Sequence, residues 1–404
     1  MSSKTKTTAT QEEVRPARVP KLRFPEFHAA PGWQPKRLGL ALKFQAGFPF
    51  PSSGFNESGN GLRLIRNRDL RSDDIVVFYS GDFDPSFVVR NGDVLVGMDG
   101  DFTPSVWEKG EALLNQRVGR ILPRGDNDHR FLLHLLTLSL KGIEQATART
   151  TVKHLSHSAV EDKHEPLPPP AEQQKIAECL SSVDELMAAL ARKVDALKTH
   201  KKGLMQQLFP TEGETQPRLR FPEFQNAGEW EESTVEELIV TVTPPQKLQT
   251  ADYQPEGEFP IVDQSQDYIC GWTNDGEAVI DKGLPVIVFG DHTCVLKFID
   301  QPFAQGADGI KILRPKRGID IRFLYYALEA NPVAQESYKR HFSMLKEKKL
   351  FYPDPKSGEQ YRIATCLSSL DALITLETQK LEALKTQKKG LMQQLFPSPE
   401  EIKE

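Results

Sequence analysis

Cysteine is scarce in this chain. Only four of its 404 residues are cysteines, namely Cys179, Cys270, Cys294 and Cys366. They are too few and too widely spaced for a disulfide framework or a zinc site, so we expect reduced thiols that pack as small apolar side chains. Unpaired cysteines are typical of a reducing compartment, which favours a cytoplasmic location.

Long apolar runs and an excess of positive charge are also missing. The longest apolar run, at 131–140, is too short to span a bilayer, and residues 1–20 lack the apolar stretch of a signal peptide. We therefore predict no membrane partner. The formal net charge is −5 and the pI is near 6.1. Since non-specific nucleic-acid binding depends on neutralised phosphates, any such contact must be local or shared with a partner.

The common catalytic motifs are absent as well. The sequence has no GxxxxGK(S/T) phosphate loop, no GxSxG elbow and no HExxH metal pair. The adenine-methyltransferase tetrapeptide is missing because Asn331-Pro332 continues into Val333, and no Glu-x-Lys follows Asp354 at a nuclease spacing. We predict that the chain is not an enzyme and holds no metal or cofactor. A methyltransferase or nuclease with a disguised site is the alternative, which an assay of methyl transfer by the isolated chain would reveal.

What the chain does contain is a repeated segment. Residues 172–210 and 359–397 align without a gap at an offset of 187, with about 25 of 39 positions identical. In both copies apolar residues recur at the alternating spacing of four and three that is typical of a coiled-coil seam. The seam positions are Ile176, Leu180, Val183, Met187, Leu190, Val194 and Leu197 in the first copy, and Ile363, Leu367, Leu370, Ile374, Leu381 and Leu384 in the second.

The two seams predict two long helices that pair with each other. Lys201, Glu377 and Lys388 are polar interruptions of the seams. At roughly 1.5 Å per residue each helix would be about 55 to 60 Å long, far more than one globular domain needs to cover its core. We therefore expect an antiparallel two-helix coiled coil that acts as a rigid spacer. The alternative is that each apolar stripe packs on the domain beside it.

A second repeated block opens each half of the chain. KLRFPEFHAAPGW at 21–33 is matched by RLRFPEFQNAGEW at 218–230. In each block two phenylalanines flank a Pro-Glu pair that cannot continue a regular helix, and Trp33 or Trp230 follows. We expect an extended clip whose aromatic rings dock onto another element.

The fold class follows from the pattern between each clip and the following helix. Short apolar runs bounded by turn residues predict strands at 62–67, 74–80, 86–98 and 118–123, and at 259–264, 278–281, 284–290 and 309–315. A helix closes each set, over 130–146 and over 321–339. We predict an α/β (α+β) fold with two similar domains, each built on mixed, largely antiparallel sheets.

The predicted domain order forms a pseudo-two-fold internal repeat. It comprises a flexible N-terminal arm at 1–20, a first α/β domain at 21–166, a first spacer helix at 167–210, a linker at 211–217, a second α/β domain at 218–355, a second spacer helix at 356–397 and a C-terminal tail at 398–404.

Basic and amide residues gather at predicted strand ends. LRLIRNRDLRSDD at 62–74 combines arginines with one asparagine. Arginine can pair bidentately with guanine and asparagine with adenine in the major groove, while further arginines contact phosphates. Weaker clusters follow at 147–158, 262–268, 290–293 and 337–343. The alternative for the first cluster is a solvated cationic edge strand.

These features together resemble a known family. Two variable α/β domains, each joined through LPPPAEQQKIA or GEQYRIA to a long helix that ends in KKGLMQQLFP, are similar to the specificity (S) subunit of a type I restriction-modification system. The resemblance covers residues from about 21 to 397. RLIRNRDL, GDVLVGMDGDF with LNQRVGRI, and LPVIVFGDHT with FAQGADGIKIL are its looser motifs. The second join, YPDPKSGEQ, departs from the family's proline-rich run.

The resemblance implies a non-catalytic reader of double-stranded DNA. Each α/β domain would be a target recognition domain that reads one half of a split site, and the paired helices would set the number of unread base pairs between the halves. The helices would also dock two methyltransferase subunits, and two restriction/translocase subunits would complete the complex. S-adenosylmethionine, ATP and Mg²⁺ are expected in these partners and none in this chain. A coiled-coil scaffold that binds no DNA is the alternative.

The resemblance also supplies the candidate DNA-binding residues by position. They are Arg66, Asn67, Arg68, Arg71, Thr151, Lys153 and His154 in the first domain, and Gln264, Ser265, Gln266, His292, Thr293, Lys339, Arg340 and His341 in the second.

Overall fold

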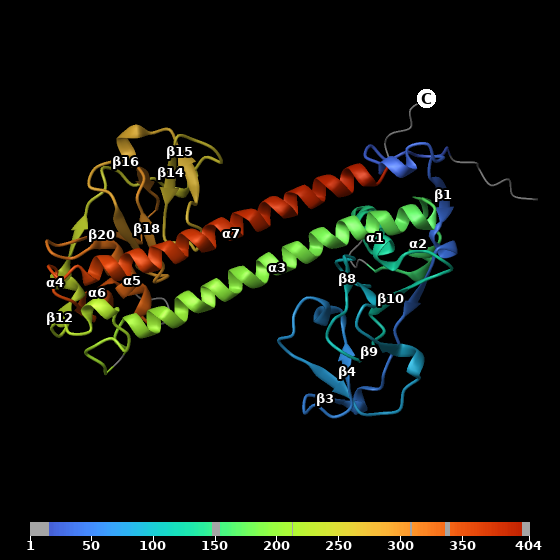
Figure 1. Ribbon diagram of the computed structural model, residues 1–404, viewed down its shortest axis with the longest axis horizontal. Coiled ribbons are helices and arrows are strands. Elements are labelled where there is room, and N and C mark those ends of the chain that lie inside the picture. The colour runs from blue at the N-terminus through green and yellow to red at the C-terminus, as the bar shows by residue number, and fades with distance from the viewer. Residues whose placement is uncertain (1–15, 148–153, 212, 308, 336–339, 398–404) are drawn as a thin grey trace, which may run out of the picture. The chain divides into compact units, whose positions relative to one another are not determined.

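The chain folds into two compact units. Figure 1 shows the computed structural model, which describes residues 16–147, 154–211, 213–307, 309–335 and 340–397. Unit 1 is formed by residues 1–189 with 382–404, and unit 2 by residues 190–381. Each unit combines one sheet-rich lobe with parts of two long helices, α3 (Pro170–Leu208) and α7 (Glu359–Leu395), which both run without a break.

Lobe 1, residues 16–167, is built around two sheets. The first has the order β2-β10-β7-β8 and is antiparallel throughout, and the second has the order β3-β5-β4-β9-β6. In the second sheet β4 runs parallel to β9, while the other pairs are antiparallel. The strands are β2 (Leu42–Ala46), β3 (Phe55–Asn56), β4 (Leu62–Ile65), β5 (Val77–Tyr79), β6 (Val88–Val89), β7 (Val94–Gly97), β8 (Pro104–Val106), β9 (Ala112–Leu114) and β10 (Val118–Pro123).

Lobe 2, residues 218–355, repeats this topology with one strand fewer in its second sheet. Its sheets have the orders β13-β20-β17-β18 and β15-β14-β19-β16, and β14 is again parallel to β19. The strands are β13 (Ile239–Val242), β14 (Phe259–Val262), β15 (Gly271–Thr273), β16 (Val279–Ile280), β17 (Val286–Gly290), β18 (Leu296–Ile299), β19 (Phe303–Gln305) and β20 (Ile310–Pro315). The predicted fold class, two similar α/β domains with mixed and largely antiparallel sheets, is confirmed.

Short elements complete each lobe. Two-stranded antiparallel ribbons link its ends, β1 (Gln34–Arg37) with β11 (His164–Leu167) and β12 (Glu231–Thr234) with β21 (Lys349–Tyr352). The helices are α1 (His129–Thr147), α2 (His157–Glu161), α4 (Val235–Leu238), α5 (Ile321–Ala330) and α6 (Phe342–Glu347). The helix expected over 321–339 therefore ends at Ala330. Pro332 has no N–H and disfavours helical torsions at Asn331, so the helix cannot continue.

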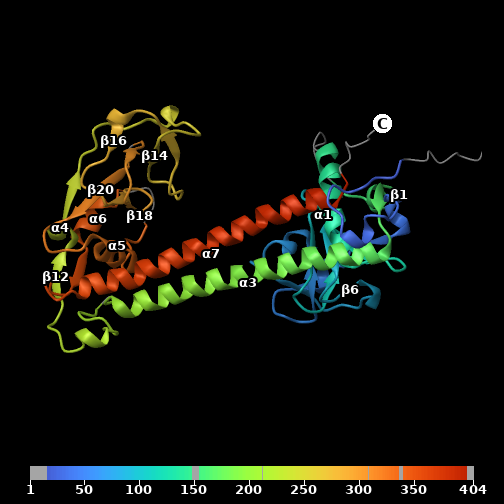
Figure 2. The same ribbon diagram turned by 45° about the horizontal axis from the view of Figure 1, so that its top comes forward.

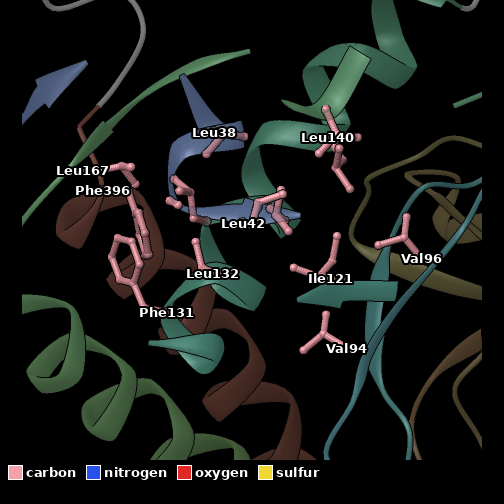
Figure 3. Packing of buried hydrophobic residues seen from close by; sticks show 14 of the residues in the cluster. Leu38, Leu42, Val94, Val96, Ile121, Phe131, Leu132, Leu140, Leu167 and Phe396 are labelled. Carbon is pink, nitrogen blue, oxygen red and sulfur yellow. The ribbon is translucent and has the colours of Figure 1, made fainter. Parts of the chain in front are cut away.

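The aromatic clips dock in the core of each unit. In unit 1 the Trp33 ring packs edge-on against Phe131 of α1 at 6.1 Å and against Phe396, just after α7, at 6.2 Å. Figure 3 shows Phe131 and Phe396 side by side next to Leu132, and Figure 2 shows the end of α7 beside α1. In unit 2 Trp230 makes the equivalent contacts. The clip thus joins the lobe to a long helix in both units.

The two long helices contact each other within each unit. In unit 1 Ile176 and Leu180 share a core with Met392 and Leu395. In unit 2 the start of α7, with Ile363 and Leu367, shares a core with the end of α3, with Met205 and Leu208. The start of one helix therefore packs on the end of the other, which is an antiparallel arrangement. Every seam side chain named above is buried or partly buried.

The polar interruptions of the seams are ion pairs. Lys388 Nζ lies 2.6 Å from Asp184 Oδ1 in unit 1, and Lys201 Nζ lies 2.8 Å from Asp371 Oδ1 in unit 2. The two pairs occupy the same repeat positions. Glu377 accepts from Lys193 and Lys380, whose ammonium groups lower its pKa. Charged pairs at seam positions penalise other alignments of the helices, so they help to set the register.

A buried ion pair fastens each clip to the start of its long helix. The Arg23 guanidinium binds both carboxylate oxygens of Glu172, at 2.7 and 2.8 Å, and Arg220 binds Glu359 at 2.9 and 2.5 Å. The neighbouring glutamine of each helix accepts from the N–H of the residue that caps α1 or α5. The second join departs from the first in sequence, yet it makes the same contacts.

Candidate nucleic-acid interface

In lobe 1 four chain segments meet at one end of the sheets. Because β4 and β9 are parallel, the residues that follow them, 66–71 and 115–117, lie at the same sheet edge. The Met98 N–H, just after β7, donates to the Arg117 oxygen at 3.0 Å, and the Leu155 N–H donates to the Met98 oxygen at 2.8 Å. The cluster at 62–74 and the described part of the later cluster, residues 154–158, are therefore brought together although they are separate in sequence.

Arg66 is held inside this end of lobe 1. Its Nε and Nη2 each lie 2.9 Å from the carboxylate of Asp69, which is buried, and Nη2 also donates to the Ile75 oxygen at 2.7 Å. The Asp69 carboxylate also accepts from the Arg66 N–H and so closes a capping box on the short helix Asn67–Leu70. Asp69 thus occupies the edge of the Arg66 guanidinium that could bind a base bidentately, and this ion pair holds the shape of the loop.

Three arginines and one histidine of lobe 1 are exposed beside carboxylates, and Arg68 Nε lies 3.8 Å from Asp69. Arg71 lies 2.5 Å from Asp101, while Arg117 lies 3.4 Å and His154 Nδ1 2.9 Å from Asp99. Arg68, Arg71 and Arg117 are 57%, 64% and 55% exposed. The hydrogen bond from Thr103 lowers the pKa of Asp101, with a smaller contribution from Arg71. The predicted residues Thr151 and Lys153 lie outside the described residues.

Sequence reasoning missed Arg117, Asp99 and Asp101. All three stand in the motifs GDVLVGMDGDF and LNQRVGRI, which carry the family resemblance. No local pattern marks them as neighbours of residues 66–71, because only the pairing of β4 with β9 and of β10 with β7 brings these turns together.

Lobe 2 gathers the corresponding segments. Gln264 follows β14, and its side-chain oxygen accepts from the His292 N–H at 3.2 Å, while the Thr293 hydroxyl donates to the Gln264 backbone oxygen at 2.7 Å. The backbone bonds of lobe 1 recur, since the Asp291 N–H donates to the Gly309 oxygen and the His341 N–H to the Asp291 oxygen. The scaffold of this end is the same in both lobes, and the side chains it carries differ.

The lobe 2 candidates differ in exposure. Gln266 and Arg340 are exposed, His292 and Thr293 are partly buried, and the Ser265 hydroxyl is buried. His341 is 0% exposed, and its ring forms a hydrogen bond with the Asp291 oxygen at 3.0 Å, so its side chain is not accessible to DNA. Its place after the basic run suggested DNA contact, but burial makes it a support for the turn. Lys339 lies outside the described residues.

A buried lysine supports the loop that carries Gln264 and Gln266. Lys297 Nζ, from β18, donates to the backbone oxygens of Asp263 at 2.8 Å and Asp267 at 2.5 Å. Burial lowers the pKa of this lysine, although Asp263 opposes the shift. Lys297 therefore ties both ends of the loop to the sheet beneath it.

Neither a metal-binding cluster nor a membrane-spanning helix is found among the described residues. Among them, no group of three or more His, Cys, Asp or Glu side chains is placed to hold a metal ion. Within the same residues, no helix has the length and apolar character needed to cross a membrane.

The fold and this site define a class of protein, a duplicated two-lobed chain with matching loop clusters on its lobes. The family described as "Type I restriction modification DNA specificity domain" matches residues 31–199 and 227–386, more than half of the chain. The chain therefore belongs to the type I restriction-modification DNA specificity family, and the resemblance drawn from its motifs is confirmed.

Individual relatives agree with this assignment. The EcoBI specificity subunit of Escherichia coli is 40% identical over 164 residues, which are 39% of this chain and 35% of that relative. The MjaVIII specificity subunit of Methanocaldococcus jannaschii is 22% identical over 419 residues, 95% of both chains. The crystal structure of the S subunit from M. genitalium covers 94% of this chain and 99% of its own, with a TM-score of 0.64 at 16% identity. At that identity the likeness concerns the fold alone.

Proposed function

We propose that this chain is the DNA-recognition subunit of a type I restriction-modification complex and that each lobe reads one half of a bipartite double-stranded site. One observation carries this proposal. The same four segments meet at the same end of both lobes, joined by the same backbone bonds, yet they expose three arginines in lobe 1 and Gln266 and Arg340, with the partly buried His292 and Thr293, in lobe 2. A shared scaffold with different exposed side chains suits two different half-sites.

The exposed cations of lobe 1 have a chemistry that suits DNA. Arg68, Arg71 and Arg117 are exposed, and exposed ion pairs contribute only about 0 to 1 kcal/mol. Asp101 can therefore release Arg71, and Asp99 can release Arg117, to a phosphate or a guanine, while Arg68 lies 3.8 Å from Asp69. The same carboxylates can accept a hydrogen bond from cytosine N4. The partners of these arginines therefore do not prevent DNA contact.

Catalysis and most of the phosphate contact belong, on this proposal, to other subunits. The helices α3 and α7 would dock two methyltransferase subunits and set the gap between the half-sites, and two restriction/translocase subunits would join them. S-adenosylmethionine, ATP and Mg²⁺ would bind in those partners. The net charge of −5 supports a division of this kind, because an acidic chain needs help to hold a polyanion. We place the complex in the cytoplasm.

Methylation-sensitive sequencing of host DNA tests the proposal. A strain with the complete system should carry a bipartite methylated motif that disappears when this chain is deleted. Exchanging residues 34–160 for those of another specificity subunit should change one half of the motif and leave the other half intact. A scaffold that binds no DNA would leave the motif unchanged in both experiments, and that result would refute the proposal.

A further inference from the structure

We propose that Asn67 and Gln264 are equivalent positioning residues, which hold the turn after β7 or β17 in the shape that presents the DNA-contacting side chains. This inference rests on the proposed function. By residue type both amides suit direct contact with adenine, which requires a free donor and a free acceptor on one carboxamide. The structure directs both amides to the protein backbone instead.

In lobe 1 the Asn67 amide is bonded to the turn that follows β7. Its Nδ2 donates to the Asp99 oxygen at 2.8 Å. Its Oδ1 lies so close to Gly97 that a Cβ there would be 2.1 Å away, so only glycine leaves space for the amide. The preceding Arg66 is fixed by the buried Asp69, which keeps the backbone of Asn67 in place.

In lobe 2 Gln264 makes the corresponding contact. Its Oε1 accepts from the N–H of His292, and His292 stands two residues after Gly290, as Asp99 stands two residues after Gly97. A Cβ at Gly309 would lie 2.5 Å from Gln264 Nε2, so a glycine again makes room for the amide. Two lobes with different loop sequences thus use an amide from the same strand end to hold the same turn residue.

The turn held in this way organises other exposed groups. In lobe 1 the Asp99 carboxylate contacts Arg117 and His154, which come from two further segments. In lobe 2 the His292 oxygen accepts from Gln335 at 3.3 Å. Loss of the amide contact should therefore disturb several DNA-contacting side chains at once. Loss of a base-reading residue should change one base pair.

Conservative amide-to-acid variants separate the two roles because they affect the two lobes in opposite ways. Asn67→Asp removes the donor and places a carboxylate against the Asp99 oxygen, so the contact is lost. Gln264→Glu keeps an acceptor for the His292 N–H, so the contact survives. If instead each residue reads adenine, each variant loses its own base contact, because a carboxylate cannot donate to N7 of the base. Gln264→Ala removes the contact in lobe 2, and Arg68→Ala is the matched control in lobe 1.

Amide hydrogen exchange of the full chain without DNA is the first measurement. In Asn67→Asp we expect residues 98–101 to exchange about 5- to 150-fold faster, the range for a lost buried hydrogen bond. Residues 290–293 should stay unchanged in that variant and serve as the internal control. Gln264→Ala should accelerate 290–293 alone, while Gln264→Glu and Arg68→Ala should match the wild type. Unchanged exchange at both turns in Asn67→Asp and Gln264→Ala overturns the proposal.

Mapping of methylated motifs in cells that carry the complete system is the second measurement. Asn67→Asp should relax every specified base pair of one half-site, and Gln264→Glu should retain the wild-type motif. Relaxation confined to a single base pair in Asn67→Asp, or loss of the motif in Gln264→Glu, would show direct reading and overturn the proposal. A wild-type strain without any bipartite motif would instead refute the proposed function. The hydrogen-exchange measurement does not depend on DNA, so it tests the role of the two amides separately.

Discussion

Replacement of Arg220 by methionine should loosen the start of α7, because it removes the partner of a buried carboxylate. The Glu359 side chain is 1% exposed, and both of its oxygens bind the Arg220 guanidinium. Removal of one partner from a buried pair leaves an unpaired buried charge and costs about 3–5 kcal/mol. Arg220 also donates to the Ala227 and Gly228 oxygens at 3.2 and 3.1 Å, so the clip is released as well.

Amide hydrogen exchange along α7 measures this effect. At about 1.4 kcal/mol for each factor of ten, the predicted cost corresponds to exchange about 100- to 4,000-fold faster over the first turns of α7. The start of α3 is the internal control, since its own Arg23–Glu172 pair remains intact. The double variant Arg220→Met with Glu359→Met should recover much of the protection, because a packed apolar pair replaces the ion pair.

Two results would refute this reasoning. A rise of less than tenfold at the start of α7 would mean that the pair contributes as little as an exposed one. Equal rises at the starts of α3 and α7 would mean that the variant destabilises the whole chain, so the effect could not be assigned to the local contact.

Three further predictions follow from the lobes and helices. Burial lowers the pKa of His134 to about 4, so the unfolded chain binds a proton at this histidine at a higher pH than the folded chain does, and unit 1 should lose stability as the pH falls from 6.5 towards 4. His134→Gln should reduce this pH-dependent loss of unfolding free energy by about 2–4 kcal/mol in denaturation experiments. An unchanged pH dependence would contradict the assignment. Arg117→Ala should relax one half-site by about 1–3 kcal/mol in motif mapping, whereas an unaltered motif would exclude Arg117 as a contact. Insertion of four residues after Leu190 lengthens α3 by about 6 Å and should alter the number of base pairs between the half-sites. An identical gap in a folded variant would show that α3 does not set this spacing.

The sequence by itself determined the duplicated plan of this protein. The seams of α3 and α7, the two aromatic clips and the family motifs are all repeated, and periodicity along a helix depends only on residues a few positions apart. Pro332 is a sequence signal for the end of α5 at Ala330, although the helix predicted over 321–339 extended past it. Such features could be predicted because neighbouring residues along the chain decide them.

Only the tertiary structure decided what each candidate side chain does. Arg66 and Arg68 look alike in sequence, yet Asp69 holds the first and leaves the second exposed. His341 is buried under its turn, and Arg117 joins residues 66–71 through a strand pairing between segments about fifty positions apart. The physical reason is that exposure and hydrogen-bond partners depend on strand register and on the glycines that admit a neighbouring side chain, and both are set by contacts between distant parts of the chain.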